Sequence, residues 1–205
     1  MNPEKTALLL IGFQNDYFAQ DGILHSVIEA SAKAMKTVEH TIELLEQLVD
    51  TPVCIISTPI FFTPNYEELT EPVGILKTIQ EVGAFQQGKK GSEIIQELEP
   101  FKEHILEVPG KRGFNAFVNT NLAKILAERD IKHLVIAGSV TSICIDSTGR
   151  SANEQGLKVS ILSDCTSART NFEQQFYVED VFPLYAETIT AQAFLEQLSL
   201  VPSLC

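Results

Sequence analysis

The sequence predicts an α/β fold in which helices cover a mostly parallel sheet. Short apolar runs of strand length alternate along the chain with longer stretches whose apolar residues recur at helical spacing. Such alternation is typical of βαβ units, whose right-handed crossovers make neighbouring strands parallel. At 205 residues, without an internal repeat or linker, the chain is expected to form one domain over residues 1–205.

Six apolar runs are expected to form the sheet. Four are rich in Ile, Leu, Val and Ala, as strands buried on both faces are, and the third and the sixth are weaker. We therefore expect a three-layer, Rossmann-like fold with a sheet of about six strands. In chain order, the predicted strands are 7–11, 53–57, 105–108, 133–137, 158–162 and 187–190.

Helical spacing fills most of the intervals between these runs. From residue 31 to 49, for example, Met35, Val38 and Ile42 would share one face of a helix. The interval 59–91 holds several Gly and Pro residues and scattered aromatics, so we expect a long loop that covers a site or carries function. Further helices are predicted at 121–129, 141–155, 172–182 and 192–198.

Composition limits the partners of the protein. The net charge of −12 argues against binding to nucleic acid or to an anionic membrane, since both attract basic surfaces. No apolar run approaches the roughly 20 residues of a membrane-spanning helix. Residues 1–5 lack the charged and apolar regions of a signal peptide. We expect a soluble cytoplasmic protein whose acidity serves mainly solubility.

Four cysteines are present, and only Cys144 lies where a catalyst would place one. No pair has the C-x-x-C spacing, which argues against a structural zinc site and thioredoxin-like redox chemistry. Cys54 falls inside an apolar run, Cys165 follows one and Cys205 ends the chain, so core, structural and mobile positions are expected for them. Cys144 follows Gly138 at the turn from a strand into a helix, and the positive end of a helix favours a thiolate.

Lys111 is the candidate partner of this thiol. It follows the strand 105–108, at the same edge of the sheet as Cys144, and Gly110 and Gly113 on either side let the backbone turn sharply. An ammonium held beside a thiol stabilises the nucleophilic thiolate. Spacing alone leaves open the alternative that Lys111 is an ordinary surface lysine.

Several segments together resemble a known superfamily. They are ALLLIGFQNDYF at 7–18, GKRGFNAF at 110–117, TNL at 120–122, AGSVTSICI at 137–145, STGR at 147–150 and LSD at 162–164. In this order and at these separations they are similar to the isochorismatase-like cysteine hydrolases. That superfamily includes nicotinamidases, N-carbamoylsarcosine amidases and ureidoacrylate amidohydrolases, and the resemblance covers nearly the whole chain.

The resemblance implies a catalytic triad of Asp, Lys and Cys that hydrolyses a C–N bond of a small amide or ureido substrate through a thioester. The nucleophile maps to Cys144 and the lysine to Lys111. The backbone N–H groups of Val140 and Cys144 would bind the oxyanion, and such donors typically contribute about 10²–10³ in rate. The family usually has a cis peptide here, between Ser139 and Val140. Its members commonly assemble, so we expect a homodimer or homotetramer.

The chain departs from the family at the aspartate of the triad. The family reads Asp-x-Gln-Asn-Asp after the first strand, whereas this chain reads GFQND, which places Gly12 at the acid/base position. Loss of a positioned acid/base typically costs about 10²–10⁴-fold in rate. Three explanations remain open: a natural variant with weak, altered or absent catalysis, a changed residue, or replacement by Asp16 or Asp164. If the other groups are intact, Gly12→Asp should raise amidase activity by orders of magnitude.

No metal and no cofactor are expected. Nicotinamidases of this superfamily bind a metal through an Asp-x-His pair after the second strand, and residues 57–62 contain no such pair. The four histidines, His25, His40, His104 and His133, are isolated in the sequence, so surface or capping positions are expected for them. The pocket wall is expected to be apolar, although each candidate residue could equally be plain core. The candidates are Phe13, Gln14, Ile60, Phe61, Phe62, Tyr66 and Phe117.

Two other functions compete with amide hydrolysis. The first is that of a non-catalytic subunit that binds a small molecule or joins an assembly, with the motif around Cys144 kept for folding. The second is ether hydrolysis of isochorismate. It ranks last because that branch of the superfamily retains the Asp and can dispense with the Cys, the opposite of the pattern in this sequence.

Overall fold

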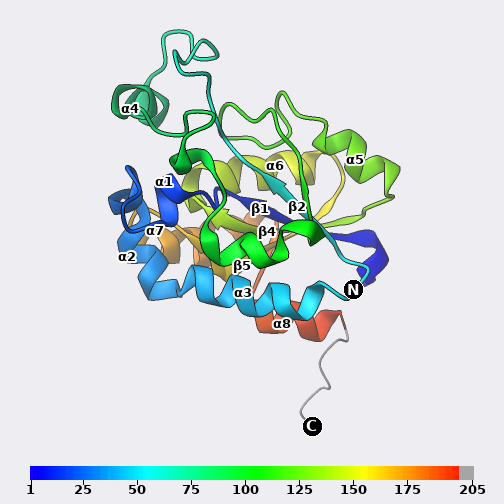
Figure 1. The fold of residues 1–205 in the computed structure, drawn as a ribbon. Helices are drawn as coiled ribbons and strands as arrows, with labels where there is room; N and C mark the ends of the chain where they lie inside the picture. Colours follow the sequence, from blue (N-terminus) through cyan, green and yellow to red (C-terminus); the bar gives the residue numbers. More distant parts are fainter. Residues whose placement is uncertain (199–205) are drawn as a thin grey trace.

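The computed structural model describes residues 1–198 and contains a six-stranded sheet with helices on both faces (Figure 1). The strands are β1 (Thr6–Ile11), β2 (Cys54–Thr58), β3 (Ile105–Glu107), β4 (His133–Ser139), β5 (Lys158–Ser167) and β6 (Glu187–Ile189). Their spatial order is β3-β2-β1-β4-β5-β6, and every neighbouring pair is parallel. This arrangement confirms the predicted three-layer α/β fold.

The sheet has a switch point between β1 and β4. From β1 the chain proceeds outward through β2 and β3 to one edge, and it then returns to β4 and continues to the other edge. The carboxyl ends of β1 and β4 therefore adjoin, and open α/β sheets bind their ligands at such a point. The register pairs Ile11 with Gly138, so the residues that follow them, Gly12 and Ser139, come together at this end of the sheet.

The helices are α1 (Asn15–Phe18), α2 (His25–Met35), α3 (Thr37–Leu48), α4 (Gly74–Val82), α5 (Leu122–Glu128), α6 (Asp146–Glu154), α7 (Asn171–Phe176) and α8 (Ala191–Gln197). Helices α3 and α8 cover one face of the sheet, and α5 and α6 cover the other (Figure 1). Leu45 of α3 and Phe194 of α8 belong to the same buried cluster as Leu8, whereas Leu126 of α5 belongs to the cluster of Leu9. Neighbouring residues of β1 thus face opposite layers, as the two-residue period of a strand requires. Within residues 1–198, every helix is too short or too polar to cross a lipid bilayer.

The helix predicted over 31–49 is in fact two helices, α2 and α3. They meet at Lys36, whose φ of 51° lies in the left-handed region. The next residue, Thr37, is fully buried and its hydroxyl is 2.7 Å from the Ser167 hydroxyl at the end of β5. This tertiary contact fixes the break, and the apolar periodicity of the sequence gives no sign of it.

Two other predicted helices change type along their length. The one predicted at 141–155 begins as a π turn (Thr141–Ile145) and becomes α-helical only in α6. The one predicted at 172–182 is α-helical only as far as Phe176, and a π turn and a 3₁₀ turn carry the chain on to Leu184. The π turns are wider and the 3₁₀ turn is tighter than an α-helix, and the packing around each segment decides which form it takes.

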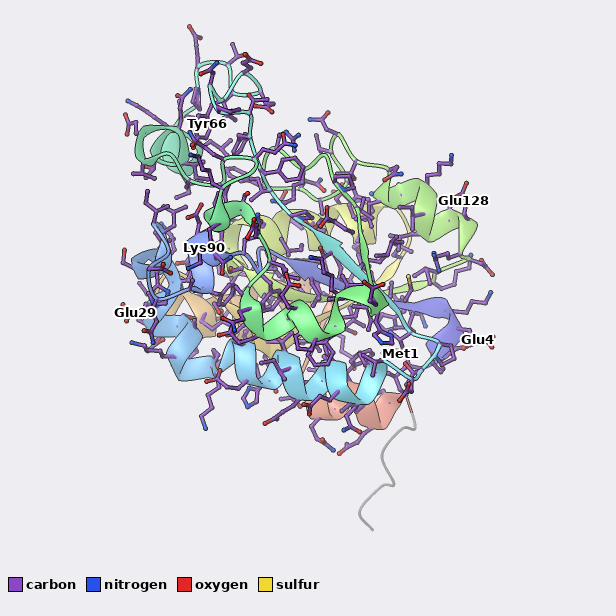
Figure 2. All side chains as sticks on the ribbon, viewed as in Figure 1. Met1, Glu4, Glu29, Tyr66, Lys90 and Glu128 are labelled. Carbon is purple, nitrogen blue, oxygen red and sulfur yellow. The ribbon has the colours of Figure 1, made fainter. Side chains whose placement is uncertain are left out.

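The interval 59–91 contains a helix, which corrects the prediction of an entirely irregular loop. Helix α4 lies within it and contributes Ile79 to a third buried cluster, which also holds Phe62, Tyr66 and Phe85. Tyr66 lies beside α4 in the part of the molecule that projects beyond the sheet (Figure 2), and its hydroxyl donates to the Ala84 carbonyl at 2.7 Å. The aromatics of this interval therefore build a small core of their own under α4.

Candidate active site

The site begins at the close approach of β1 and β4. A β-carbon on Gly138 would lie 1.8 Å from the Ile11 carbonyl oxygen, and the φ of Gly138 is +121°. Only glycine permits this backbone contact. The peptide bond that follows it, between Ser139 and Val140, is cis. Beyond it the chain enters the turn that carries Cys144.

Cys144 lies on the π turn Thr141–Ile145 between β4 and α6 and is 7% exposed. The N–H groups of Ile143 and Ile145 both donate to the Val140 carbonyl, at 3.0 and 3.2 Å. The Thr141 hydroxyl donates to Gln174 Oε1 at 2.6 Å, so the turn is also fastened to α7. The thiol is therefore held on a turn fixed at several points, with Val140 immediately before the turn and Cys144 near its end.

Lys111 points into the same part of the interior. It is 1% exposed, and its Nζ donates to Cys144 Sγ at 3.4 Å and to the Gly113 carbonyl at 2.6 Å. Lys111 takes part in no ion pair with a carboxylate of the described chain. A buried ammonium favours a negative partner, and here the adjacent thiol can supply that charge as a thiolate. This excludes the alternative of a surface lysine.

Gly12 faces the cis peptide at the end of β1. Its φ is +74°, and a β-carbon there would lie 2.8 Å from the Ser139 carbonyl oxygen and 3.4 Å from Ser139 Oγ. L side chains rarely adopt this φ, and real β-carbons do not approach a backbone oxygen so closely. The backbone in this conformation therefore suits glycine, and an aspartate at this position requires the loop after β1 to move.

A small chamber lies between these groups. Its volume is about 10 Å³, which is hardly enough for one water molecule. Helix α4 closes the chamber with Ile75, Leu76 and Ile79, so the interval 59–91 covers the site as the sequence suggested. The chamber is lined by Gly12, Tyr17, Ile60, Ile75, Leu76, Ile79, Lys111, Phe114, Ser139, Ile143 and Cys144.

The two hydroxyl groups of the chamber were not predicted from the sequence. Tyr17 is 4% exposed, and no hydrogen bond joins its hydroxyl to another of the described residues. Burial raises the pKa of the Tyr17 hydroxyl well above its usual range, and the neighbouring Cys144 and Asp16 act in the same direction. Ser139 is fully buried, and its Oγ has no hydrogen-bond partner within residues 1–198.

Of the residues predicted to line the pocket, Ile60 alone borders the chamber. Phe13, Gln14 and Phe61 instead line a cavity of about 700 Å³, together with Gly12 and with Leu10, whose side chain belongs to the α3 and α8 face. Phe62 and Tyr66 are core residues of the cluster under α4, and Phe117 packs against the cluster on the opposite face of the sheet. These three positions are therefore corrected from pocket to core, because the packing of α4 and α5 covers them.

The residues that sequence reasoning missed come from several segments. Ile75, Leu76 and Ile79 have the spacing of one helix face, which could have revealed α4. Tyr17 lies in α1, which begins directly after Gln14, but the two residues line different cavities, so the position of Gln14 gives no indication of Tyr17. Phe114 and Ile143 lie inside the motif segments 110–117 and 137–145 but were not assigned to the pocket.

The two carboxylates considered as replacements are engaged elsewhere. Asp16 Oδ2 accepts a hydrogen bond from the Phe85 N–H at 2.6 Å, and Asp164 Oδ1 accepts one from the Ala191 N–H at 2.9 Å. Neither residue lines the chamber. Their bonds to backbone N–H groups give both a structural role and leave the position beside Cys144 without a carboxylate.

None of the four histidines lines the chamber. His25 contacts the Tyr17 carbonyl, and His40 contacts the Asp164 carbonyl. His133 is the first residue of β4, and its ring lies 2.8 Å from the Ser160 hydroxyl. His104 is exposed at the end of a 3₁₀ turn. In the part of the chain from residue 1 to 198, no three His, Cys, Asp or Glu side chains converge on a point where a metal ion could bind.

A buried thiol beside a buried lysine, at the switch point of a parallel α/β sheet, is an arrangement that suits nucleophilic catalysis by cysteine. The comparisons with known proteins agree with this kind of site. The family model of the isochorismatase domain matches residues 6–193, so the chain belongs to the isochorismatase family.

Curated relatives extend over nearly the whole chain. An uncharacterized isochorismatase family protein, YddQ of Bacillus subtilis, is 28% identical over 201 residues, which cover 93% of this chain and 99% of YddQ. The ureidoacrylate amidohydrolase RutB of Rhizobium rhizogenes is 26% identical over 212 residues, which cover 97% of this chain and 85% of RutB.

Solved structures show the same fold at lower identity. A cysteine hydrolase from Pseudomonas syringae superposes with a TM-score of 0.81 at 19% identity, covering 98% of this chain and 96% of its own. The N-carbamoylsarcosine amidase from Thermoplasma acidophilum has a TM-score of 0.71 at 22% identity, covering 91% of this chain and 96% of its own.

Proposed function

We propose that this protein is a metal-independent cysteine hydrolase that cleaves a C–N bond of a small amide or ureido compound through a thioester on Cys144. The observation that carries the proposal is the 3.4 Å contact between Lys111 Nζ and Cys144 Sγ inside a closed chamber. The names of two relatives, a ureidoacrylate amidohydrolase and an N-carbamoylsarcosine amidase, support this class of substrate.

In the proposed reaction, the Lys111 ammonium holds Cys144 as a thiolate, which attacks the carbonyl carbon of the substrate. A C–S bond forms, and the carbonyl oxygen becomes an oxyanion that the N–H groups of Val140 and Cys144 would stabilise. Collapse of this intermediate expels the nitrogen, which must gain a proton to leave as an amine. Water then cleaves the thioester and must lose a proton. Gly12 can carry neither proton, so turnover is expected to be slower than with an aspartate by about 10²–10⁴-fold.

A non-catalytic binding role is the second candidate. It is favoured by the conformation of Gly12, which suits glycine and leaves no space for a carboxylate without a backbone shift. In that case the Cys144 turn serves to close the chamber, and the protein binds its ligand without cleaving it.

The reactivity of Cys144 tests the catalytic proposal. Iodoacetamide should alkylate Cys144 near neutral pH faster than a small free thiol, because the thiolate is already formed. Lys111→Met should lower this rate at least about tenfold, which corresponds to only about 1.4 kcal/mol of ion-pair stabilisation. Peptide mass spectrometry would follow Cys144, with Cys54 as a second thiol in the same chain.

Lys124→Met is the matched control, since Lys124 is exposed on α5 and pairs only with Glu128. A melting curve of each variant separates a lost ion pair from unfolding. If Cys144 of the parent protein were alkylated no faster than a small free thiol, the catalytic proposal would be wrong and the binding role would be favoured.

A further inference from the structure

The chamber around Cys144 contains no side chain suited to carry a proton to a leaving group or from water, among the residues that the structure describes. Among residues 1–198, its only ionisable side chains are Tyr17, Lys111 and Cys144, and none of the residues that line it is Asp, Glu or His. Lys111 already donates to Cys144 Sγ and to the Gly113 carbonyl, and its charge is what balances a thiolate. A proton lost from Lys111 would remove that balance, so the lysine is not free to shuttle protons.

The two hydroxyl groups can donate hydrogen bonds but are poor proton carriers. The raised pKa of the Tyr17 hydroxyl keeps it protonated at neutral pH, and a phenolate in this apolar chamber would be costly. The aliphatic hydroxyl of Ser139 lies 3.4 Å from the position of a β-carbon on Gly12 and has no partner within the described chain. Both groups are therefore suited to hold a polar atom of a substrate in place.

Whether such a site can cleave a substrate depends on the leaving group. An amine leaves a tetrahedral intermediate only after it gains a proton, so an amide needs an acid in the chamber. A phenolate or a thiolate leaves with its electron pair and needs no proton. The attacking Cys144 thiolate has no proton to dispose of either, so acyl transfer from an aryl ester or a thioester requires no proton carrier at all.

We infer that the Cys144 chamber takes short activated acyl donors, namely aryl esters and thioesters, in preference to amides, and that the acyl-enzyme accumulates. This inference rests on the proposed use of Cys144 as the nucleophile. In the first step the C–S bond to Cys144 forms and the bond from the carbonyl carbon to the leaving oxygen or sulfur breaks. The second step needs water to lose a proton, and without a base it becomes the slow step. The chamber is barely large enough for one water molecule, so any acyl donor requires α4 to move, and a short acyl group requires the smallest movement.

The experiment compares two substrates with the same acyl group, 4-nitrophenyl acetate and 4-nitroacetanilide. The ester should release a rapid burst of one nitrophenolate per chain, followed by a slow phase, and mass spectrometry should find one acetyl group on the peptide that holds Cys144. The anilide should give no burst over times about 10²-fold longer. Hydroxylamine needs no base to attack the thioester, so it should accelerate the slow phase and return Cys144 as a thiolate.

Cys144→Ser and Lys111→Met are the controls for acetylation elsewhere, and both should lose the burst. A burst from the anilide, or ester turnover without a trapped acetyl-Cys144, would overturn the inference. An anilide burst that disappears in Tyr17→Phe would overturn it in a specific way, by making Tyr17 the proton donor. If Cys144 is neither acetylated by the ester nor rapidly alkylated by iodoacetamide, the proposed function itself fails.

Discussion

At the scale of single residues, Gly12 decides what the site can do. Its φ of +74° and the 2.8 Å approach of a β-carbon to the Ser139 carbonyl predict that any side chain there strains the loop. We expect Gly12→Ala and Gly12→Asp to lower the free energy of unfolding by about 1–3 kcal/mol. Urea denaturation followed by circular dichroism would measure the loss.

Gly88→Ala is the control for this prediction. Gly88 has a similar φ of +78°, but no atom lies within 4 Å of its β-carbon position. Its substitution should lower the free energy of unfolding by only about 1 kcal/mol, the cost of placing an L residue in the left-handed region. If both substitutions lowered the free energy of unfolding equally, the backbone at Ser139 would have to move away from the new β-carbon at little energetic cost. A Gly12→Asp protein that is fully stable and hydrolyses amides would show that the site tolerates the family aspartate after all.

Individual residues also show what the sequence could reveal about the site. Cys144 and Lys111 could be singled out because each follows a strand at a glycine-hinged turn, and the structure brings them within 3.4 Å. Tyr17 and Ser139 could not be assigned roles, since a hydroxyl gains or lacks a partner only through the fold. The positive φ of Gly12 could not be predicted from the sequence either. Because of it, the expected result of Gly12→Asp is a loss of stability instead of a gain of activity.

At the scale of elements, the side chain of Gln14 ties the loop after β1 to the segment that covers the site. Its amide accepts from the Ile60 N–H at 2.9 Å and donates to the Ile60 carbonyl at 2.8 Å and to the Ser92 carbonyl at 2.7 Å. Gln14→Ala should destabilise the protein by about 1–3 kcal/mol, because buried backbone groups lose their partners.

The same substitution should loosen the segment that carries α4. Hydrogen exchange at the Ile60 amide and limited proteolysis within 59–91 should both become faster than in the parent protein. Gln96→Ala is the control, since Gln96 is exposed. Unchanged exchange at Ile60 in Gln14→Ala would assign the position of this segment to the apolar cluster under α4 instead.

The sequence predicted strands better than the helices that join them. All six strands begin close to their predicted positions, because buried parallel strands are continuous apolar runs, although β5 continues to Ser167, well beyond its predicted end at residue 162. The split at Lys36 and the π turn at Thr141–Ile145 were not predicted, since tertiary contacts determine both. Helix α4 was missed because Pro72, Gly74 and Gly83 at its ends are typical of a loop, although its apolar spacing is helical.

At the scale of the whole molecule, the candidate active site lies at the carboxyl ends of the strands, and we expect the amino ends to contribute only to stability. The carboxyl ends of the strands hold Gly12, Ser139 and the Cys144 turn, whereas the amino ends hold His133 at the start of β4. His133 contacts the Ser160 hydroxyl at 2.8 Å and is half-buried. Changes at the amino ends should therefore affect stability without reaching the thiol.

The pH dependence of stability provides a test of this separation. Burial lowers the pKa of His133, and the positive charge of Lys158 adds to this, while Glu187 opposes it. The folded protein thus binds fewer protons than the unfolded chain, in which a histidine titrates near about 6.5. The contribution of His133 is fully present above that pH and is lost as the pH falls through the lower, folded pKa.

His133→Gln should therefore flatten the fall in the urea midpoint between about pH 7.5 and 5.5, the range in which the unfolded histidine takes up its proton. His104→Gln, at an exposed position, should leave the slope of the parent protein unchanged. The rate of Cys144 alkylation should be the same in both variants at every pH, because the thiol lies at the opposite end of the sheet. An identical slope in His133→Gln and the parent would remove His133 as the source of acid sensitivity, and a changed alkylation rate would show that the two ends are coupled through β4.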